Sequence, residues 1–357
     1  MFLSLNLFFI FKFLKYLPLK QKYKHTVKEF KQLIESSDSI LLATHVNADG
    51  DAIGTSLALA MVLKKLGKKV NVVVPNDFPE FLRWLPGNDL ISVYFKEEKK
   101  VRSLVKSAQL LVCLDFNDPD RLAKAEKDIL AFNGKKVLID HHPNPKQFTD
   151  LTISDTGLGS AAELLFYVLR EMNYDHLIDK DIAEALYVGI MTDTGNFNFA
   201  SSYPEVWETV AELIKLGICK DEIYARVYDN FSVDRMKLMG YCLNEKMTII
   251  PGSKAAYISL SLEEMKKFNH QPGDTEGFVN LPFSIRGVKL SALFLEKNDK
   301  IKVSLRSRGD FSVNDFSANH FRGGGHKNAA GGEWDKPMDE AIKRFVMLLE
   351  EYKNELS

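Results

Sequence analysis

The sequence predicts an α/β protein in which an N-terminal, doubly wound and mainly parallel sheet is joined by a helical linker to a smaller α+β domain. Three observations carry this prediction. Strand and helix patterns alternate from about Ser39 to Asn198, the strand segments are unbroken apolar runs, and hairpin patterns begin after about Phe231. A chain of 357 residues with 45% hydrophobic residues is long enough to form two cores.

The N-terminal strands are predicted from runs rich in Val, Ile and Leu without polar alternation. Such runs are typical of parallel strands that helices cover on both faces. The first strand, ILLATHV, is followed by a helix, SLALAMVLKKLG, that ends at Gly67. Three further strands are predicted at KKVNVVVP (68–75), AQLLVCLDF (108–116) and KKVLIDHH (135–142).

Two more helices complete this part of the chain. Ser160 and Glu163 have the spacing of a capping box and predict a helix start ahead of LLFYVLREM. The stretch KDIAEALYVGIMTDTG predicts a second helix that ends at Asp193 and Gly195.

The C-terminal part has a different pattern. Residues 245–261 predict an antiparallel hairpin that turns at Pro251–Gly252, and residues 288–307 predict a second hairpin that turns at Asn298–Asp299. An amphipathic helix over 338–356 ends the chain. We therefore expect an N-terminal extension over 1–25, a first domain with linker helices over 26–235 and a second domain over 236–357.

Composition limits the classes of function. A net charge of −1 provides no general basic field, so we expect no long nucleic acid as a partner. The three cysteines lack metal-type spacing, and Cys113 lies in an apolar run, which indicates a buried thiol in a reducing, cytoplasmic setting. The apolar N-terminal stretch carries Lys12 and Lys15 and lacks the features of a secretory signal. We interpret it as an extension or an upstream start, rather than a stable membrane attachment.

Metal-type ligands follow the predicted strands at their carboxyl ends, where open α/β sheets gather function. Gly50 lets the chain turn tightly there, and the helix that follows points its N-terminus at the same pocket, which favours a bound anion. An isolated Asp-Gly-Asp or His-His is most often a turn or a packing feature. Their joint occurrence predicts a metal site, because folding gains nothing from gathering carboxylates that repel one another. The candidate residues are His45, Asp49, Asp51, Asp115, Asp140, His141, His142 and Asp193.

A set of carboxylates and imidazoles suits Mn²⁺ or a similar divalent ion better than Ca²⁺, which prefers oxygen alone. Six ligands are more than one catalytic ion needs, and they suit two ions roughly 3.5–4 Å apart. Such a pair activates water and neutralises charge on a phosphoryl oxygen.

A second cluster lies in the C-terminal part. Gly323, Gly324 and Gly325 precede His326, and Arg306 and Ser307 lie nearby in sequence. Exposed backbone N–H groups and arginines indicate a phosphate or nucleotide cradle. A glycine loop that permits tight packing, beside solvated arginines, explains the same residues equally well.

With these motifs the chain resembles the DHH-family phosphoesterases that carry a C-terminal DHHA1 domain. His45-x-x-x-Asp49-x-Asp51, Asp115, Asp140–His141–His142 and Asp193 match the four N-terminal motifs in order, and GGGHKNAAGG matches the DHHA1 signature. The resemblance runs from about Thr26 to the end. Ala48 stands where many relatives have proline, which we expect to alter loop stiffness more than ligation.

The resemblance implies a role for each residue. One ion would be held by His45, Asp49, Asp115 and Asp193, and the second by Asp51, Asp115, His141 and Asp193, so that Asp115 and Asp193 bridge. Asp140 would orient an imidazole, and His142 would face the scissile phosphate. Arg306, Ser307 and the loop Gly323–His326 would bind the nucleotide end of the substrate. We interpret Arg121 as part of a local ion pair rather than a substrate contact.

Length and layout resemble the bacterial group that acts as oligoribonuclease (nanoRNase) and 3′-phosphoadenosine 5′-phosphate phosphatase. We therefore expect a Mn-dependent dimetal phosphoesterase that acts on short single-stranded RNA or a small nucleotide in a cleft between its domains. The alternatives are a linear or cyclic dinucleotide phosphodiesterase, an exopolyphosphatase or pyrophosphatase, and a non-catalytic nucleotide-binding regulator. Whether the chain forms a homodimer stays open.

Overall fold

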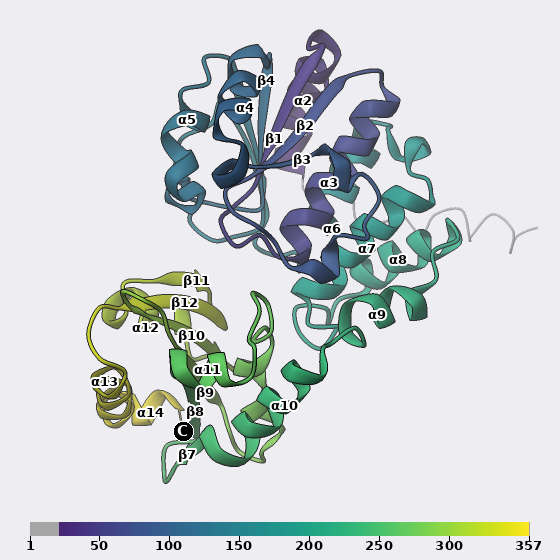
Figure 1. Cartoon of the computed structure of the whole chain (residues 1–357). Helices are drawn as coiled ribbons and strands as arrows, with labels where there is room; N and C mark the ends of the chain where they lie inside the picture. Colours follow the sequence, from purple (N-terminus) through teal and green to yellow (C-terminus); the bar gives the residue numbers. More distant parts are fainter. Residues whose placement is uncertain (1–20, 357) are drawn as a thin grey trace, which may run out of the picture. The chain divides into compact units, whose positions relative to one another are not determined.

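The computed structural model describes residues 21–356, and the chain divides into two compact units, the first ending at Asp229 and the second beginning at Asn230 (Figure 1). The apolar stretch at the N-terminus lies outside the described residues. None of the helices within residues 21–356 is long and apolar enough to cross a membrane.

The first unit is built on a six-stranded parallel sheet with the order β3–β2–β1–β4–β5–β6. The chain runs outward from β1 to β3 and then returns to place β4 on the other side of β1, so the order reverses between β1 and β4. This is the doubly wound sheet that the sequence predicts. The strands are β1 (Ser39–Ala43), β2 (Lys69–Val74), β3 (Ile91–Val93), β4 (Leu110–Leu114), β5 (Lys135–Asp140) and β6 (Leu151–Ser154).

Helices cover both faces of this sheet (Figure 1). Ile40 and Leu42 of β1 face the core formed with α2, α3, α6 and α7, whereas Leu41 and Ala43 face α4 and α5. Every strand position therefore meets apolar side chains, which explains the unbroken apolar runs. The helices are α2 (Lys24–Ser36), α3 (Gly50–Lys65), α4 (Tyr94–Ser107), α5 (Glu126–Leu130), α6 (Ala161–Glu171), α7 (Lys180–Asp193), α8 (Pro204–Lys215) and α9 (Lys220–Tyr228).

Helix α3 begins six residues earlier than the predicted start at Ser56, because Asp49 caps it. Oδ1 of Asp49 accepts hydrogen bonds from the backbone N–H groups of Asp51 and Ala52, both at 3.1 Å. The first turn is buried, so its residues show no polar face in the sequence. A Cβ at Gly54 would lie 2.4 Å from the carbonyl oxygen of Ala185, so this glycine permits the close approach of α3 to α7.

The predicted capping box at α6 is half formed. Oγ of Ser160 accepts from the backbone N–H of Glu163, but the Glu163 carboxylate accepts from the Tyr203 and Tyr167 hydroxyls instead of the Ser160 backbone. The short edge strands β3 and β6 were not predicted, because three or four residues are too few to show a period.

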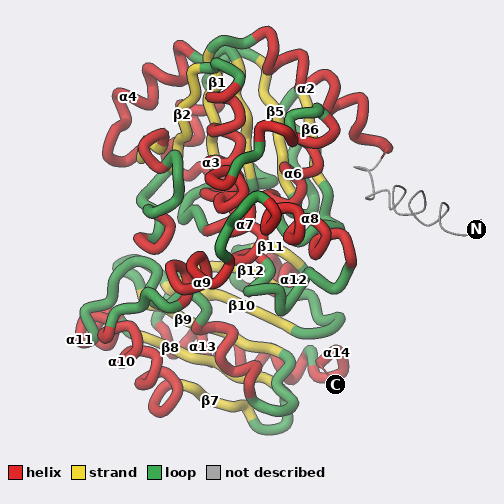
Figure 2. Tube along the Cα trace, turned by 90° about the vertical axis from the view of Figure 1, so that its right-hand side faces the viewer, coloured by secondary structure: helices red, strands yellow, loops and turns green. Residues whose placement is uncertain are grey.

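The second unit contains a mixed sheet with the order β11–β12–β10–β9–β8–β7 (Figure 2). The two predicted hairpins are confirmed as β7–β8 and β9–β10, and only β8 and β9 pair in parallel. The strands are β7 (Met247–Ile250), β8 (Ala255–Leu260), β9 (Leu290–Glu296), β10 (Ile301–Ser307), β11 (Gly324–His326) and β12 (Ala329–Trp334). The helices are α10 (Val233–Tyr241), α11 (Leu262–Lys267), α12 (Val313–His320), α13 (Met338–Glu351) and α14 (Lys353–Leu356).

Candidate metal centre and substrate residues

The predicted ligands gather at the carboxyl edge of the first sheet, where the strand order reverses. They come from the segments after β1, β4 and β5, from the first turn of α3 and from the last residue of α7. Several groups of these side chains offer ligand atoms that all lie within 4.8 Å of one another, and two of the groups together contain the six predicted metal ligands. The first group is His45, Asp49 and Asp115, and the second is Asp51, His141 and Asp193.

His45 presents one ring nitrogen to the carboxylates. Its Nδ1 lies 2.9 Å from the carbonyl oxygen of Val46, which places the ring proton on Nδ1. Nε2 then faces Oδ2 of Asp115 at 3.5 Å and Oδ1 of Asp49 at 4.0 Å. A neutral imidazole with its lone pair directed at two carboxylates is the form that binds a metal ion.

His141 is the centre of the second group. Its Nε2 lies 3.3 Å from Oδ2 of Asp193 and 3.6 Å from Oδ2 of Asp51. The same nitrogen lies 3.5 Å from Oδ1 of Asp115. The two oxygens of Asp115 therefore face the two groups, one each, which is the arrangement of a bridging carboxylate.

Asp51 is held by the N-terminus of α6. Its carboxylate accepts from the backbone N–H groups of Ala161 at 2.6 Å and Ala162 at 2.9 Å, and from Oγ1 of Thr55 at 3.1 Å. The N-terminus of α3 is likewise occupied by Asp49. The anion that we expected at the start of α3 is thus a carboxylate of the chain itself, so these amides are not available to a substrate.

Two buried carboxylate oxygens near β4 and β5 have no hydrogen-bond partner among the described residues, Oδ1 of Asp115 and Oδ2 of Asp140. Asp115 also has a left-handed backbone with φ of 62°, a strained conformation of the kind that occurs at functional sites. Buried anionic oxygens without donors fit bound cations. The donor set of imidazoles and carboxylates therefore fits the predicted pair of divalent ions.

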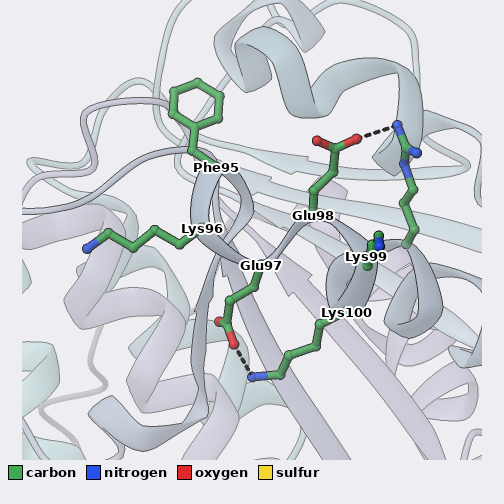
Figure 3. A pocket seen from close by; sticks show the side chains of 7 residues that line it. Phe95, Lys96, Glu97, Glu98, Lys99 and Lys100 are labelled. Carbon is green, nitrogen blue, oxygen red and sulfur yellow. Dashed lines mark hydrogen bonds and ion pairs between the residues drawn. The ribbon is translucent and has the colours of Figure 1, made fainter.

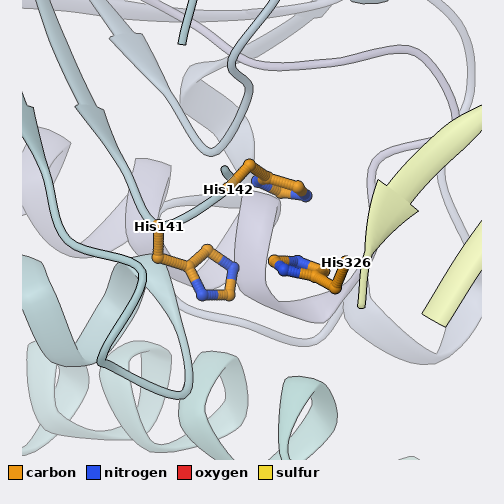
Figure 4. A group of neighbouring side chains, drawn as sticks. All are labelled: His141, His142 and His326. Atoms are coloured by element: carbon orange, nitrogen blue, oxygen red, sulfur yellow. The ribbon is translucent and has the colours of Figure 1, made fainter. Parts of the chain in front are cut away.

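His142 pairs with Asp140. Its Nδ1 lies 2.8 Å from Oδ1 of Asp140, which is fully buried, so the ring is oriented through one nitrogen. The rings of His141 and His142 meet edge to face, with centroids 4.9 Å apart (Figure 4). His141 thus directs its Nε2 at the carboxylates, while His142 is fixed by Asp140.

The burial of these carboxylates and their distances from one another also shift their pKa values. Burial raises the pKa of Asp51 well above its ordinary value, and the charges of Asp115 and Asp193 add to this. Burial likewise raises the pKa of Asp193 to about 6. Burial alone would raise the pKa of Asp115, but the nearby imidazoles of His141 and His45 outweigh it and lower the pKa well below the ordinary value. In the metal-free chain protons thus offset part of the negative charge, and divalent ions would displace them.

A pair of asparagines, Asn47 and Asn76, supports the loop that carries His45 and Asp49, and this pair was not predicted from the sequence. The backbone N–H of Asn47 donates to Oδ1 of Asn76 at 2.6 Å, and Nδ2 of Asn76 donates to Oδ1 of Asn47 at 3.1 Å. Asn47 has a φ of 57°, a conformation that asparagine tolerates better than most residues. This pair fixes the loop between His45 and Asp49, which contains Ala48.

Arg121 does not form the local ion pair that we expected. Its Nε atom is buried without a hydrogen-bond partner, and no carboxylate within residues 21–356 lies within ion-pair distance of its guanidinium.

In the second unit, Arg306 and His326 lie on the same face of the sheet. Arg306 of β10 and His326 of β11 both pair with Ala329 of β12, and residues directly opposite one another point to the same side. Ser307 points to the other side. Its Oγ donates to the carbonyl oxygen of Phe311 at 2.7 Å and accepts from Nδ2 of Asn328 at 2.8 Å, so its hydroxyl is used within the fold.

The glycine loop packs tightly against its own unit. The backbone N–H of Gly325 donates to Oδ1 of Asn314 at 2.8 Å, and that of Gly323 donates to the carbonyl oxygen of Ser317 at 3.3 Å. A Cβ at Gly323 would lie 1.8 Å from the carbonyl oxygen of Gly331, and one at Gly325 would lie 2.5 Å from that of Ala329. The packing explanation accounts for these two glycines, and their amides are not free for a phosphate.

Gly324 differs from its neighbours. A Cβ there would meet only Oδ1 of Asn314, at 3.4 Å, and one at Gly331, directly opposite on β12, would meet only a carbonyl oxygen at 3.8 Å. The sheet face beside Arg306 and His326 is therefore flat and open.

A surface hollow at α4 carries no site. It is lined by residues 95–100 and Arg102 (Figure 3). Lys100 pairs with Glu97, Arg102 pairs with Glu98, and Lys96 pairs with Asp77 outside the hollow. Paired surface charges of this kind offer little to a ligand.

Comparison with known proteins agrees with this geometry. The model of the DHH family, N-terminal domain, matches residues 39–190, and the DHHA1 domain model matches residues 253–355. The bifunctional oligoribonuclease and PAP phosphatase NrnA of Thermus thermophilus is 32% identical over 316 residues, which cover 87% of this chain and 89% of the relative. The Bacillus subtilis protein of the same name is 26% identical and covers 91% and 99%.

Two solved structures show the same fold. The crystal structure of an exopolyphosphatase-related protein from Bacteroides fragilis has a TM-score of 0.89 and 42% identity, over 93% of this chain and 98% of the other. RecJ from Thermus thermophilus in complex with Mn²⁺ has a TM-score of 0.55 and 16% identity, over 94% of this chain and 55% of the other.

Proposed function

Because the chain belongs to the DHH family of phosphoesterases with a C-terminal DHHA1 domain, we propose that it hydrolyses short oligoribonucleotides and 3′-phosphoadenosine 5′-phosphate. The observation that carries this proposal is the position of Asp115. Its two carboxylate oxygens face two separate groups of ligands, each with one imidazole and a further carboxylate.

We propose that His45, Asp49 and Asp115 hold one divalent ion and that Asp51, His141, Asp193 and Asp115 hold the other, with Asp193 also reaching the first. Mixed nitrogen and oxygen ligands favour Mn²⁺. Two bound ions lower the pKa of water and neutralise charge on a phosphoryl oxygen.

The chain's own residues prepare this centre. The amides of Ala161 and Ala162 fix the Asp51 carboxylate, and Asn76 fixes the loop that carries His45 and Asp49. Asp140 holds Nδ1 of His142, so we infer that Nε2 of His142 faces the scissile phosphate, where it steadies an oxygen or passes a proton to the leaving group.

In the second unit we assign the nucleotide end of the substrate to Arg306 and His326, on the open sheet face beside Gly324. A guanidinium and an imidazole on one face provide charge-assisted donors for a phosphate. Ser307 and the amides of Gly323 and Gly325 support this face from within, since their hydrogen bonds are used inside the fold.

We propose short substrates because the chain offers no basic field for a long strand, with a net charge of −1. We also infer a reducing, cytoplasmic setting, which the three free cysteines support.

The test is a substrate panel with purified, Mn²⁺-loaded protein. It contains single-stranded RNA of two to twenty nucleotides, 3′-phosphoadenosine 5′-phosphate, linear and cyclic dinucleotides, and polyphosphate, because one similar structure is described as exopolyphosphatase-related. We expect kcat/KM to fall beyond about five nucleotides, since only a few stacking and phosphate subsites are available. Chelation should abolish activity.

The Asp49→Ala variant serves as the matched inactive control and excludes a contaminating nuclease. Equal or rising efficiency toward 20-mers contradicts the preference for short substrates. Hydrolysis of polyphosphate alone contradicts the nucleotide assignment, and full activity after exhaustive metal removal contradicts the dimetal mechanism.

A further inference from the structure

Arg121 is tied to the segment that carries the first metal ligand. It lies in the 3₁₀ helix η5 (Pro119–Ala125), which follows the loop after Asp115. The carbonyl oxygen of Arg121 accepts a hydrogen bond of 2.7 Å from the backbone N–H of Val46, the residue directly after His45. The base of the Arg121 side chain is therefore placed beside the candidate metal centre.

The segment around Arg121 has a defined conformation. Oδ1 of Asp118 caps η5 by accepting from the backbone N–H of Asp120 at 3.0 Å, and Nδ2 of Asn117 donates to the carbonyl oxygen of Pro143 at 2.6 Å. Ala123 has φ of 49° and ψ of −129°, a strained conformation for alanine. The fold thus maintains this turn against a local energetic cost.

The guanidinium lacks carboxylate partners of the kind that Arg83 and Arg102 have in the same unit. Arg83 pairs with Asp77 and Glu80, and Arg102 pairs with Glu98 and Asp128. Nε of Arg121 is buried with no acceptor, and no carboxylate pairs with this residue within the described part of the chain. A buried charged donor without an acceptor is costly, so a ligand is its expected partner.

The unpartnered atoms near this centre are of two kinds. Oδ1 of Asp115 and Oδ2 of Asp140 are acceptors and call for cations, whereas Nε of Arg121 is a donor and calls for an anion. A phosphate bound at the metal ions would bring anionic oxygens to this place.

We propose that Arg121 binds a non-bridging oxygen of the phosphate that is hydrolysed. This inference rests on the proposed function, and it assigns to the first unit a substrate contact separate from Arg306 and His326. A guanidinium suits the task because its planar fork binds a phosphate through parallel N–H groups.

A purely structural role for Arg121 makes different predictions. If its charge only balanced the ligand carboxylates, Arg121→Ala would change the Mn²⁺ affinity or the melting temperature. If it binds phosphate, those two quantities stay near wild type, and phosphate affinity and kcat/KM fall. The loss of one charge-assisted hydrogen bond corresponds to about a tenfold to hundredfold decrease.

The experiment compares Arg121→Ala and Arg121→Lys with Arg102→Ala, an arginine of the same unit whose partners are on the surface. Each Mn²⁺-loaded protein is titrated with inorganic phosphate by calorimetry, and kcat/KM is measured on a dinucleotide and on 3′-phosphoadenosine 5′-phosphate. We expect a decrease for Arg121→Ala, a smaller decrease for Arg121→Lys, and no change for Arg102→Ala. Added guanidinium should partly restore Arg121→Ala alone.

Unchanged phosphate affinity in Arg121→Ala, or a decrease that only follows lost Mn²⁺, overturns the assignment. If the wild type hydrolyses none of the substrates, the proposed function fails, and the phosphate titration still decides the role of Arg121. Activity in the wild type with no effect of Arg121→Ala rejects the arginine contact and leaves the proposed function standing.

Discussion

Oδ1 of Asp115 lies 3.5 Å from Nε2 of His141, and this buried oxygen has no hydrogen-bond donor within residues 21–356. The other oxygen, Oδ2, lies 3.5 Å from Nε2 of His45. One side chain thus connects the two groups of candidate ligands, and the strained backbone of Asp115 holds it there.

Asp115→Asn should be the most damaging single substitution, because both ions lose charge compensation at once. We expect the bound Mn²⁺ to fall below two per chain and kcat to fall roughly 10²–10³-fold or more. Metal analysis and kinetics at saturating substrate measure both. Asp150→Asn, which removes a partner of Lys135, is the surface control. Wild-type metal content in Asp115→Asn would remove the bridging assignment.

Asp140→Asn should lower kcat with little change in bound Mn²⁺. Asp140 orients His142 through a 2.8 Å hydrogen bond, and the substitution removes the negative charge of the acceptor carboxylate. Residues that orient a functional imidazole typically contribute 10–100-fold. A double-mutant cycle with His142→Ala gives the measurement. Strictly additive effects of the two substitutions would show that Asp140 acts independently of His142.

Arg306→Ala should raise KM with little effect on kcat, because its contact with the nucleotide end is equal in the ground and transition states. The loss of a charge-assisted hydrogen bond costs about 1.5–3 kcal/mol, or roughly tenfold to over a hundredfold in affinity. Lys302→Ala, on the same face of β10, is the matched control. An unchanged KM for every substrate would refute the assignment of this face.

Glu264→Gln should destabilise the second unit at neutral pH and lose its effect in acid. Burial raises the pKa of Glu264, but its polar contacts outweigh burial and lower the pKa to about 2. The carboxylate accepts hydrogen bonds from the backbone N–H of Ser261 and from the Tyr241 hydroxyl, and it pairs with Lys246 at 2.7 Å. A carboxyl group with a lowered pKa stabilises the folded state above its ordinary pKa of 4.5 and loses this contribution as the pH falls toward 2. The shift corresponds to roughly 3 kcal/mol.

Urea unfolding at pH 7 and pH 3 compares Glu264→Gln with Glu263→Gln, the exposed neighbour on α11. The difference between wild type and Glu264→Gln should shrink between the two values of pH. A difference that stays constant would mean that the charge of Glu264 does not stabilise the unit.

Much of the fold was predictable because the relevant patterns are local. The apolar runs of β1, β4 and β5 specify buried parallel strands, and parallel strands deliver their carboxyl ends to one edge. The sequence alone therefore places His45, Asp115 and His141 at one edge of the sheet. The start of α3 was missed because burial on all sides leaves no polar face to mark its first turn.

Residue types and their spacing were enough to assign the side chains of the candidate metal centre, since strand ends and glycine turns follow from the local sequence. The distribution of their hydrogen bonds, in contrast, depends on how distant segments pack. Asp51 takes the amides of a helix more than a hundred residues away, Gly325 gives its amide to Asn314, and Arg121 keeps a buried donor without a partner. Such pairings depend on contacts between segments distant in the chain, and those contacts form only when the whole unit packs.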